Sequence, residues 1–328
     1  MTINFLSPEI KPDSIPDDLL SGFPSVDAIV ELPGSGLTLV GARPRQGRSV
    51  FLMNLLLRIT QANPASSVVY ISFEDWAMKI ATKLLNITCD TLVDEDNPAG
   101  NLQKLEDLIK FGEKIPEALQ TRINSFNSLI LERRLFIIES PDFIEDAIEK
   151  IKEIGSSTEQ VVLMIDSIHQ VNLRSEFANK FLRLEAAASL LRETALRLKI
   201  PVIAGFSLPS EFRSKKEIDL NRALIESFEK DASMIMCLWN ESRQKEEDSK
   251  KPSSGIKTDF EIMVLKNRNG PSPVEFLFRL NRQTFALYDP KDPPPTAAPA
   301  ISTNSISKKS KRIRQSIHKA IVLPCVNT

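Results

Sequence analysis

The feature that most constrains the fold of this chain is a series of short, fully apolar runs rich in Val and Ile. They are LTLVGARP at 37–44, SVVYISF at 67–73, LFIIES at 135–140, VVLMID at 161–166 and PVIAGFS at 201–207. Segments with the apolar spacing of amphipathic helices separate them, such as RSVFLMNLLLRIT and EAAASLLRETALRLK. Parallel strands joined by helices are the arrangement that covers such strands on both faces. We therefore expect an α/β fold with a mainly parallel central sheet flanked by helices.

The C-terminal part of the chain has a different pattern of apolar runs. After Asp231 the runs SMIMCLW, DFEIMVLK, VEFLFRL and FALY follow one another without long helices, which indicates antiparallel edge strands. From Asp289 the segment DPKDPPPTAAPA is a proline-rich linker, and a basic segment follows it. We expect three parts: an N-terminal arm at 1–20, one domain at 21–288, and a tail at 289–328 with too little apolar content to fold.

Composition excludes several classes of protein. The net charge is −1, and the three cysteines and two histidines are too few and too scattered for a disulfide framework or a structural zinc site. The first residues carry acidic side chains and prolines where a signal peptide needs a basic tip and an apolar run. No apolar stretch approaches the length of a membrane span. We expect a cytoplasmic protein that has no membrane partner.

A candidate phosphate-binding loop follows the first apolar run and opens a helix. The usual pattern is G-x-x-x-x-G-K-[ST], in which backbone N–H groups hold phosphates. Gly47 and Ser49 fit the pattern, whereas Ala42 replaces the first glycine and Arg48 replaces the lysine. A tight basic turn between a strand and a helix is the alternative. The candidate nucleotide-binding residues are Ala42, Arg43, Pro44, Arg45, Gln46, Gly47, Arg48, Ser49 and Val50.

Arg48 decides what chemistry this loop supports. A lysine ammonium is a compact charge that fits between phosphates, whereas a guanidinium is larger and planar. We therefore expect ATP binding together with slow hydrolysis.

Other candidate site residues stand at strand ends. Asp166 ends the run VVLMID, where a carboxylate can organise Mg²⁺ through water, although any buried strand can end in Asp. Glu74 follows SVVYISF and could polarise an attacking water, or it is a solvated acid. Lys266 and Arg268 lie two apart in LKNRNGP, either as a pair of cations for the phosphate of a neighbouring subunit or as part of a surface ion-pair face.

The order of these motifs resembles one family. The segments SGFPSVDAI, GARPRQGRSVFLMNL, VVYISFED, VVLMIDSIHQ, IPVIAGFSLPS, FEKDASMIMCLW and LKNRNGPSPVEFLFRL are similar to successive landmarks of the ATPase domain of DnaB-type replicative DNA helicases, over residues 21–288. The resemblance implies a RecA-like P-loop fold, a ring-shaped homo-oligomer, ATP and Mg²⁺ as cofactors, and translocation on single-stranded DNA. It implies that Ser49 and Asp166 hold Mg²⁺ and that Glu74 is the catalytic base. Lys266 and Arg268 would act in trans.

Several positions depart from the family pattern. Ser207 and His169 stand where the family often has glutamine, and the family's separate N-terminal helical domain is not found in this sequence. The expected DNA-binding loop keeps basic Arg213, Lys215 and Lys216 but has lost the usual acidic-basic signature.

Two functions therefore remain open. One is an ATP-dependent DNA helicase or translocase in replication. The other is a catalytically weak or inactive RecA-like subunit that regulates or partners a replication protein. A strand-exchange recombinase is disfavoured by the LKNRNGP landmarks. Trp76 and Trp239 are expected to be packing residues, since no stripe of interleaved aromatic and basic residues suggests base stacking.

Overall fold

The structure is a computed structural model of the chain that describes residues 19–88, 117–155, 159–210, 212, 214–215, 218, 228–249 and 257–292. Within these residues nine strands form one sheet, in the order β3-β2-β4-β5-β1-β6-β7-β8-β9. The strands are β1 (Gly36–Ala42), β2 (Ser66–Ser72), β3 (Leu135–Glu139), β4 (Gln160–Asp166), β5 (Pro201–Ser207), β6 (Met234–Trp239), β7 (Lys257–Asn267), β8 (Val274–Asn281) and β9 (Leu287–Tyr288). The pairs from β3 through to β6 are parallel, and those from β6 to β9 are antiparallel.

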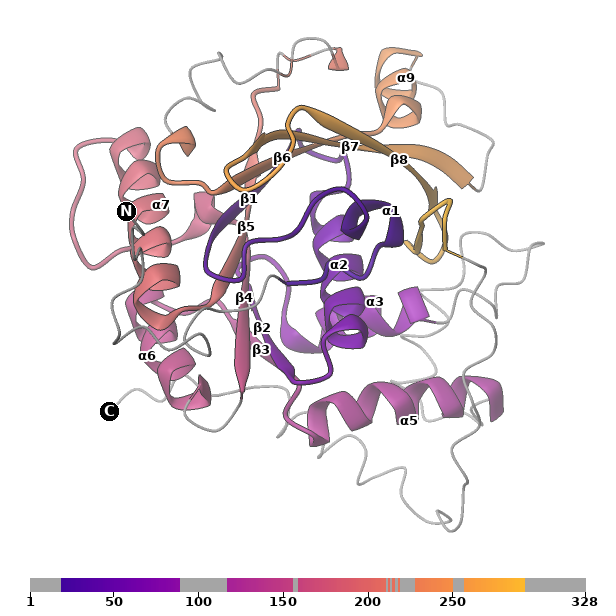
Figure 1. Cartoon of the computed structure of the whole chain (residues 1–328), viewed down its shortest axis with the longest axis horizontal. Helices are drawn as coiled ribbons and strands as arrows, with labels where there is room; N and C mark the ends of the chain where they lie inside the picture. Colours follow the sequence, from indigo (N-terminus) through magenta and orange to yellow (C-terminus); the bar gives the residue numbers. More distant parts are fainter. Residues whose placement is uncertain are drawn as a thin grey trace, which may run out of the picture.

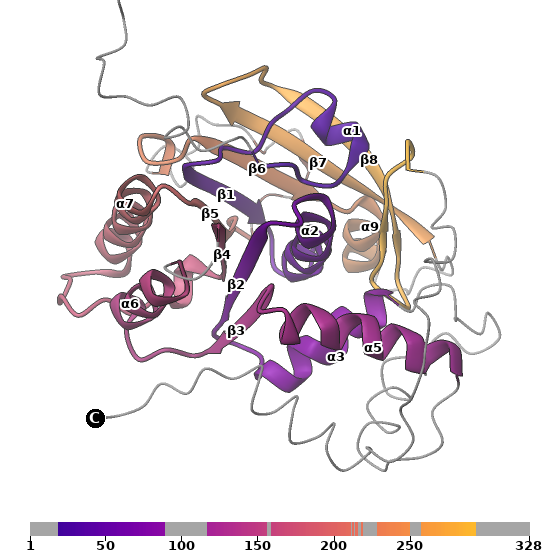
Figure 2. The same cartoon turned by 60° about the horizontal axis from the view of Figure 1, so that its bottom comes forward.

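Helices cover both faces of the parallel part. The helices are α1 (Pro24–Asp27), α2 (Arg48–Ala62), α3 (Ala77–Thr88), α5 (Glu117–Leu131), α6 (Ile144–Gly155), the short 3-10 helix η3 (Ile168–Gln170), α7 (Lys180–Leu198) and α9 (Glu241–Ser249). Figure 1 shows the order of the elements, and Figure 2 shows α2, α3 and α5 on one face of the sheet with α6 and α7 on the other. This is the α/β arrangement expected from the sequence, and the prediction is confirmed.

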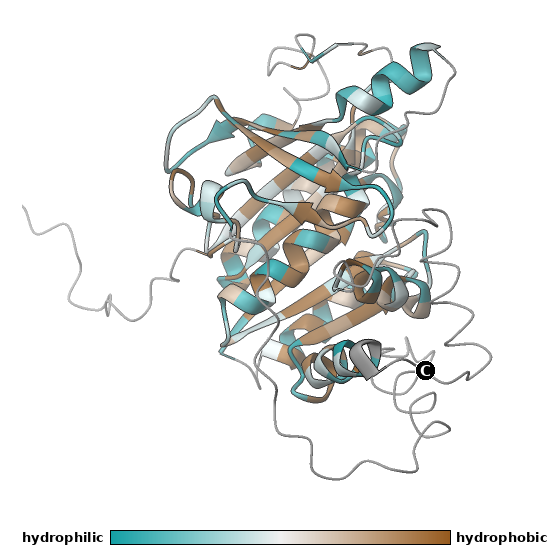
Figure 3. Cartoon of the chain, turned by 90° about the vertical axis from the view of Figure 1, so that its right-hand side faces the viewer, coloured by the Kyte–Doolittle hydropathy of each residue, from teal (hydrophilic) through white to brown (hydrophobic). Residues whose placement is uncertain are grey.

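Alternation along each strand builds two cores. In β2, Val68 and Tyr70 face the side of α2 and α3, whereas Val69 and Ile71 face the side of α6 and α7. Every residue of β1 and β2 is buried, which explains why these strands read as unbroken apolar runs. In Figure 3 the strands inside the molecule are coloured as hydrophobic.

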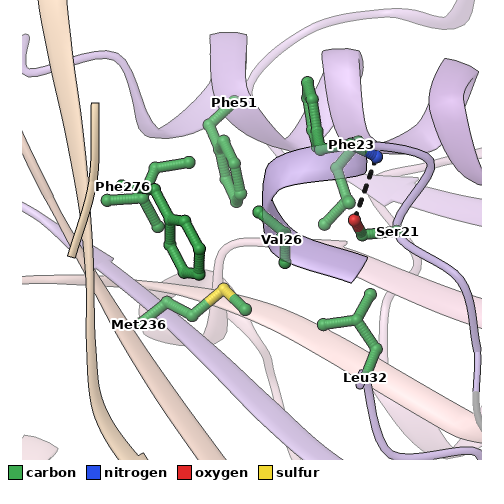
Figure 4. A pocket seen from close by; sticks show the side chains of 9 residues that line it. Ser21, Phe23, Val26, Leu32, Phe51, Met236 and Phe276 are labelled. Atoms are coloured by element: carbon green, nitrogen blue, oxygen red, sulfur yellow. Dashed lines mark hydrogen bonds between the residues drawn. The ribbon is translucent and has the colours of Figure 1, made fainter. Parts of the chain in front are cut away.

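The antiparallel strands bend over the N-terminus of α2. The ring of Phe260 from β7 stacks on that of Phe51 from α2, with centroids 6.5 Å apart. Close by, Phe23, Phe51 and Phe276 surround a small apolar cavity of about 10 Å³, together with Met236 (Figure 4). A space of this size holds about one water at most, so it is a packing gap and not a ligand site.

Three expectations need correction. The run that forms β6 pairs in parallel with β1, so the antiparallel edge begins only at β7. The nine-residue helix α9 separates β6 from β7. Trp239 is buried as expected, but the Trp76 side chain is 73% exposed because it precedes α3 at the open edge of the sheet.

The ends of the described chain contact the domain. Leu19 is buried and forms an isolated bridge with Leu32. Asp289 is buried and accepts a hydrogen bond from the Ser25 backbone N–H at 2.6 Å, and Asp292 forms an ion pair with Arg58. Contacts with the domain therefore extend at least to Asp292. The rest of the predicted arm and tail lies outside the described residues, and the division into three parts stays a prediction.

Candidate functional site

The candidate phosphate loop lies between the end of β1 at Ala42 and the start of α2 at Arg48. Gly47 caps α2 in the left-handed region, with φ of 96°, and a Cβ there would lie 2.8 Å from Cε2 of Phe260. Both the backbone angle and the close approach of Phe260 require glycine at this position. The loop therefore delivers the backbone N–H groups at the N-terminus of a fifteen-residue helix, the geometry that binds anions.

Pro44 and Arg45 are the exposed residues of this loop, whereas Ala42 is buried. Ser49 and Val50 are half-buried in the first turn of α2.

The predicted site residues of neighbouring strands meet at the same edge. Ala42 pairs with Ser207 at the ends of β1 and β5, and Ser72 pairs with Asp166 at the ends of β2 and β4. Glu74 is exposed two residues beyond β2 and accepts a hydrogen bond from Nε2 of Gln170 at 2.7 Å. Because the carboxyl ends of parallel strands share one edge, Glu74 and Asp166 both lie on the side of the phosphate loop.

Arg48 does not point away from the sheet. Its Nε donates to Oδ1 of Asp166 at 3.0 Å, and its Nη1 donates to Oγ of Ser207 at 2.9 Å. The Arg48 and Asp166 side chains are only 14% and 10% exposed. Arg48, at the position of the usual phosphate-loop lysine, is therefore paired with Asp166, the carboxylate predicted to organise Mg²⁺, and Ser207 accepts its second hydrogen bond.

The second oxygen of Asp166 is also used. The hydroxyl of Tyr70 donates to Oδ2 of Asp166 at 3.2 Å. Burial, followed by the charge of Asp166, raises the pKa of Tyr70 well above its usual value, so the phenol stays a neutral donor. Sequence reasoning missed this residue. The available signal was a tyrosine inside an otherwise apolar strand, because a buried hydroxyl needs a partner.

Helix α9 holds the other side of the loop. Arg43 is buried, and its Nη2 lies 3.0 Å from Oε2 of Glu247, while Nη1 donates to Gln244. Oε1 of Gln46 accepts from the backbone N–H of Asn240 at 2.8 Å. These contacts use two predicted nucleotide-binding side chains to fix the loop backbone. Nothing in the sequence pattern indicated α9 as their partner.

His169 lies beside this network in η3. Burial, together with the charges of Lys180 and Arg48, lowers the pKa of His169 to about 4, although a hydrogen bond to the Ser207 backbone opposes the shift. The imidazole is therefore neutral at physiological pH.

Lys266 and Arg268 lie on the side of the sheet where the parallel strands begin, whereas the phosphate loop lies on the side where they end. Lys266 pairs with Ile235 near the start of β6, whereas the loop follows the other end of neighbouring β1. Lys266 Nζ donates to the carbonyl of Glu229, and Arg268 Nη2 donates to that of Lys230 at 2.7 Å. Burial and the adjacent charge of Arg268 lower the pKa of Lys266. These two cations do not reach the phosphate loop of their own chain.

The predicted DNA-binding residues are only partly described. Lys215 forms ion pairs with Glu261 and Glu275. Although burial opposes the shift, its hydrogen bonds to these carboxylates raise its pKa. Arg213 and Lys216 lie outside the described residues. Their roles, like those of the other site residues, stay predictions.

Two other kinds of feature are not found among the described residues. No group of three or more His, Cys, Asp or Glu side chains in this part of the chain is placed to hold a metal ion. No helix there is both long and apolar enough to cross a membrane.

Comparison with known proteins gives a family match over most of the chain. The family model for the DnaB-like helicase C terminal domain matches residues 18–286. The replicative DNA helicase DnaB of Buchnera aphidicola subsp. Baizongia pistaciae (strain Bp) is 24% identical over 250 residues, covering 73% of this chain and 49% of that protein. The Haemophilus influenzae (strain ATCC 51907 / DSM 11121 / KW20 / Rd) DnaB is 24% identical over 261 residues, covering 76% and 51%. The chain spans about half the length of these curated relatives. The resemblance found in the motifs is confirmed.

Solved structures give the same fold. One solved ATPase domain superposes with a TM-score of 0.67 at 15% identity, covering 85% of this chain and 93% of that one. A DnaB-like replicative helicase, described with its interactions with primase, gives 0.66 at 15% identity, covering 84% and 64%. A KaiC-like protein, PH0186 from Pyrococcus horikoshii OT3, gives 0.51 at 12% identity, covering 83% and 98%. These similarities confirm the RecA-like fold.

Proposed function

Because the chain belongs to the DnaB-like helicase C-terminal domain family, we propose that it is an ATP-binding subunit that acts on single-stranded DNA in replication and hydrolyses ATP slowly. The observation that carries this proposal is the ion pair between Arg48 and Asp166. ATP binding is supported by the phosphate loop at the N-terminus of α2, whose backbone angles and glycine are those of an anion site.

Slow hydrolysis follows from how the charged groups are used. Phosphoryl transfer depends on positioned charge, so a misplaced cation affects the transition state more than ground-state binding. Arg48 presents a planar donor array and already holds Asp166, so neither group is free to follow charge that develops on the transferred phosphate. Glu74 is the group that could polarise the attacking water, and its bond to Gln170 would orient it.

A second candidate function is a working helicase. The observation that favours it is the position of Lys266 and Arg268. They form a pair of adjacent cations bound to main-chain carbonyls at the edge of the sheet away from their own loop. A phosphate brought there by a neighbouring subunit would relieve their mutual repulsion. A homo-oligomeric ring in the cytoplasm would supply that phosphate in trans.

Partners follow from the same family. The solved helicase described with primase shows that a relative interacts with another replication protein. We propose single-stranded DNA and a replication protein as partners of this chain, with Arg213, Lys215 and Lys216 as candidate DNA contacts. Lys215 would first have to exchange its bonds to Glu261 and Glu275 for phosphate contacts.

An ATPase assay with Mg²⁺, with and without single-stranded DNA, tests the proposal. We expect slow turnover by the wild-type chain and faster turnover by Arg48→Lys, because a lysine would release Asp166. Adding Glu74→Gln to Arg48→Lys should abolish the gain while leaving nucleotide affinity in place. Arg197→Lys is the matched control, since it makes the same substitution at an exposed position of α7 outside the phosphate loop.

One result separates the two candidate functions, and another would contradict both. Brisk DNA-stimulated hydrolysis by the wild-type chain would favour the working helicase and contradict the role given to Arg48. Failure of both the wild-type chain and Arg48→Lys to bind nucleotide would contradict ATP binding itself.

A further inference from the structure

The Arg48–Asp166 contact is part of a built slot and not a chance surface pair. A Cβ on Gly205 would lie 2.9 Å from Cδ and 3.0 Å from Nε of Arg48, so the glycine makes room for the guanidinium. Ser207, two residues further along β5, accepts the bond from Nη1 at 2.9 Å. Tyr70 closes the far side by donating to Asp166. Three strands thus seat one arginine against one carboxylate.

This slot conflicts with the metal site that the family resemblance implies. Mg²⁺ prefers carboxylate, phosphate and water oxygens in near-ideal octahedral geometry. Both oxygens of Asp166 already accept hydrogen bonds, one from a guanidinium and one from a phenol. The charge of Asp166 is neutralised by Arg48, and that cation would also repel a divalent metal nearby. The residues around Asp166 therefore do not fit Mg²⁺.

The guanidinium retains capacity for a second anion. Its bonds to Asp166 and Ser207 use two of the five N–H groups of an arginine. The remaining donors belong to a side chain that starts at the first residue of α2, beside the backbone N–H groups of the phosphate loop. Exposed Arg45 adds a second positive charge in the same loop.

We propose that this chain binds a nucleoside di- or triphosphate in its metal-free form, through the N–H groups of Arg48 that Asp166 and Ser207 leave unused and the backbone N–H groups of the phosphate loop. This inference rests on the nucleotide binding proposed above and deepens it. Asp166 then serves as a positioning residue that holds the guanidinium. Asp166 could take the predicted role in holding Mg²⁺ only when its carboxylate is no longer paired with Arg48.

The test compares nucleotide affinity with and without divalent metal. The full chain is titrated into a fluorescent, non-hydrolysable ATP analogue, once in excess Mg²⁺ and once in EDTA, and anisotropy gives the dissociation constant. For the wild-type chain we expect the two constants to agree within about twofold, well below the tenfold step that corresponds to 1.4 kcal/mol. For Arg48→Lys we expect Mg²⁺ to tighten binding about tenfold or more, because Asp166 is released.

Further variants assign the effect to Asp166. Adding Asp166→Asn to Arg48→Lys should remove the acquired Mg²⁺ dependence, whereas Arg197→Lys, at an exposed position of α7 outside the phosphate loop, should behave like the wild-type chain. If Arg48→Lys does not fold, the wild-type titration alone decides.

Each remaining outcome has a defined meaning. A wild-type affinity that falls tenfold or more in EDTA overturns this inference but leaves the proposed nucleotide binding intact. Persistence of the Mg²⁺ dependence in the Arg48→Lys, Asp166→Asn variant would also overturn it. Absence of binding in both buffers would refute the proposed function itself.

Discussion

Replacing Arg48 with methionine tests the energetic value of the seated arginine. Methionine keeps an unbranched side chain that reaches to about the position of Nε, but it removes the charge and both donated bonds. Removing one partner of a buried ion pair typically costs about 3–5 kcal/mol, because the other charge stays buried and unpaired. The Arg48 and Asp166 side chains keep 14% and 10% of their exposure. We therefore reduce the expected loss to about 3 kcal/mol for this partly solvated pair.

Thermal unfolding followed by circular dichroism measures this loss. For a domain of this size about 1 kcal/mol corresponds to roughly 2–4 °C, so the melting temperature should fall by roughly 6–12 °C. Arg45→Met is the matched control, because the same substitution at an exposed position of the same loop should shift the melting temperature by about 2 °C at most.

A double-mutant cycle separates the ion pair from general disruption of the loop. In Arg48→Met with Asp166→Asn, both charges are absent and the amide oxygen can still accept from Tyr70, so part of the stability should return. We expect a coupling energy of about 2 kcal/mol, within the range of residues in direct contact. Equal shifts in Arg48→Met and Arg45→Met, or a coupling below about 0.5 kcal/mol, would refute the pairing.

Three further predictions concern neighbouring features. The pKa of His169 is lowered to about 4 in the fold, against an ordinary value of about 6.5, so neutral His169 contributes stability above pH 6.5 that is lost as the pH falls towards 4. His169→Gln should remove about 2 kcal/mol of this pH dependence. If the melting temperatures of the wild-type chain and the variant fall equally from pH 7 to pH 4, the prediction is wrong. Gly205→Ala should destabilise the protein by about 1–3 kcal/mol in thermal unfolding, and by less when Arg48 is also replaced with alanine; equal losses in both backgrounds would show that the two residues do not compete for space. Deleting 293–328 should leave the melting temperature nearly unchanged, whereas deleting 289–328 should cost about 1–3 kcal/mol through the buried contacts of Asp289, and equal melting temperatures would show that these contacts contribute nothing.

The parallel half of the fold could be predicted because burial on both faces leaves a direct trace in the sequence. All seven residues of β1 and of β2 are buried, and unbroken apolar runs encode this. The pairing of β6 with β1 was predicted wrongly, although the same trace of burial on both faces is present there. All six residues of β6 are buried, like those of the parallel strands, whereas the start of β7 and most of β8 alternate buried and exposed positions. The absence of alternation in MIMCLW indicated a strand buried on both faces, as in the parallel part of the sheet. Because no long helix follows this run, it was grouped with the antiparallel strands instead.

The edge of the sheet that holds the candidate site could also be predicted, because strand order along the chain fixes which residues follow a buried strand. The contacts of Arg48 could not. Its partners Asp166 and Ser207 lie 118 and 159 positions away, and the bonds depend on the direction of one long side chain. Charge and residue type at position 48 are equally compatible with a guanidinium that faces a phosphate.

The change at position 48 is best understood together with two positions on β5. A guanidinium is wider than an ammonium, and it fits here because Gly205 has no Cβ and because Ser207 is short enough to accept a bond instead of filling the space. A glutamine at position 207, as the family resemblance would lead one to expect, carries two additional carbon atoms and would occupy this space itself. Arg48, Gly205 and Ser207 therefore form one physical unit that anchors Asp166. Because the hydrogen bonds of this unit are made within the fold, Arg48 is held in place by the domain and holds Asp166 with it.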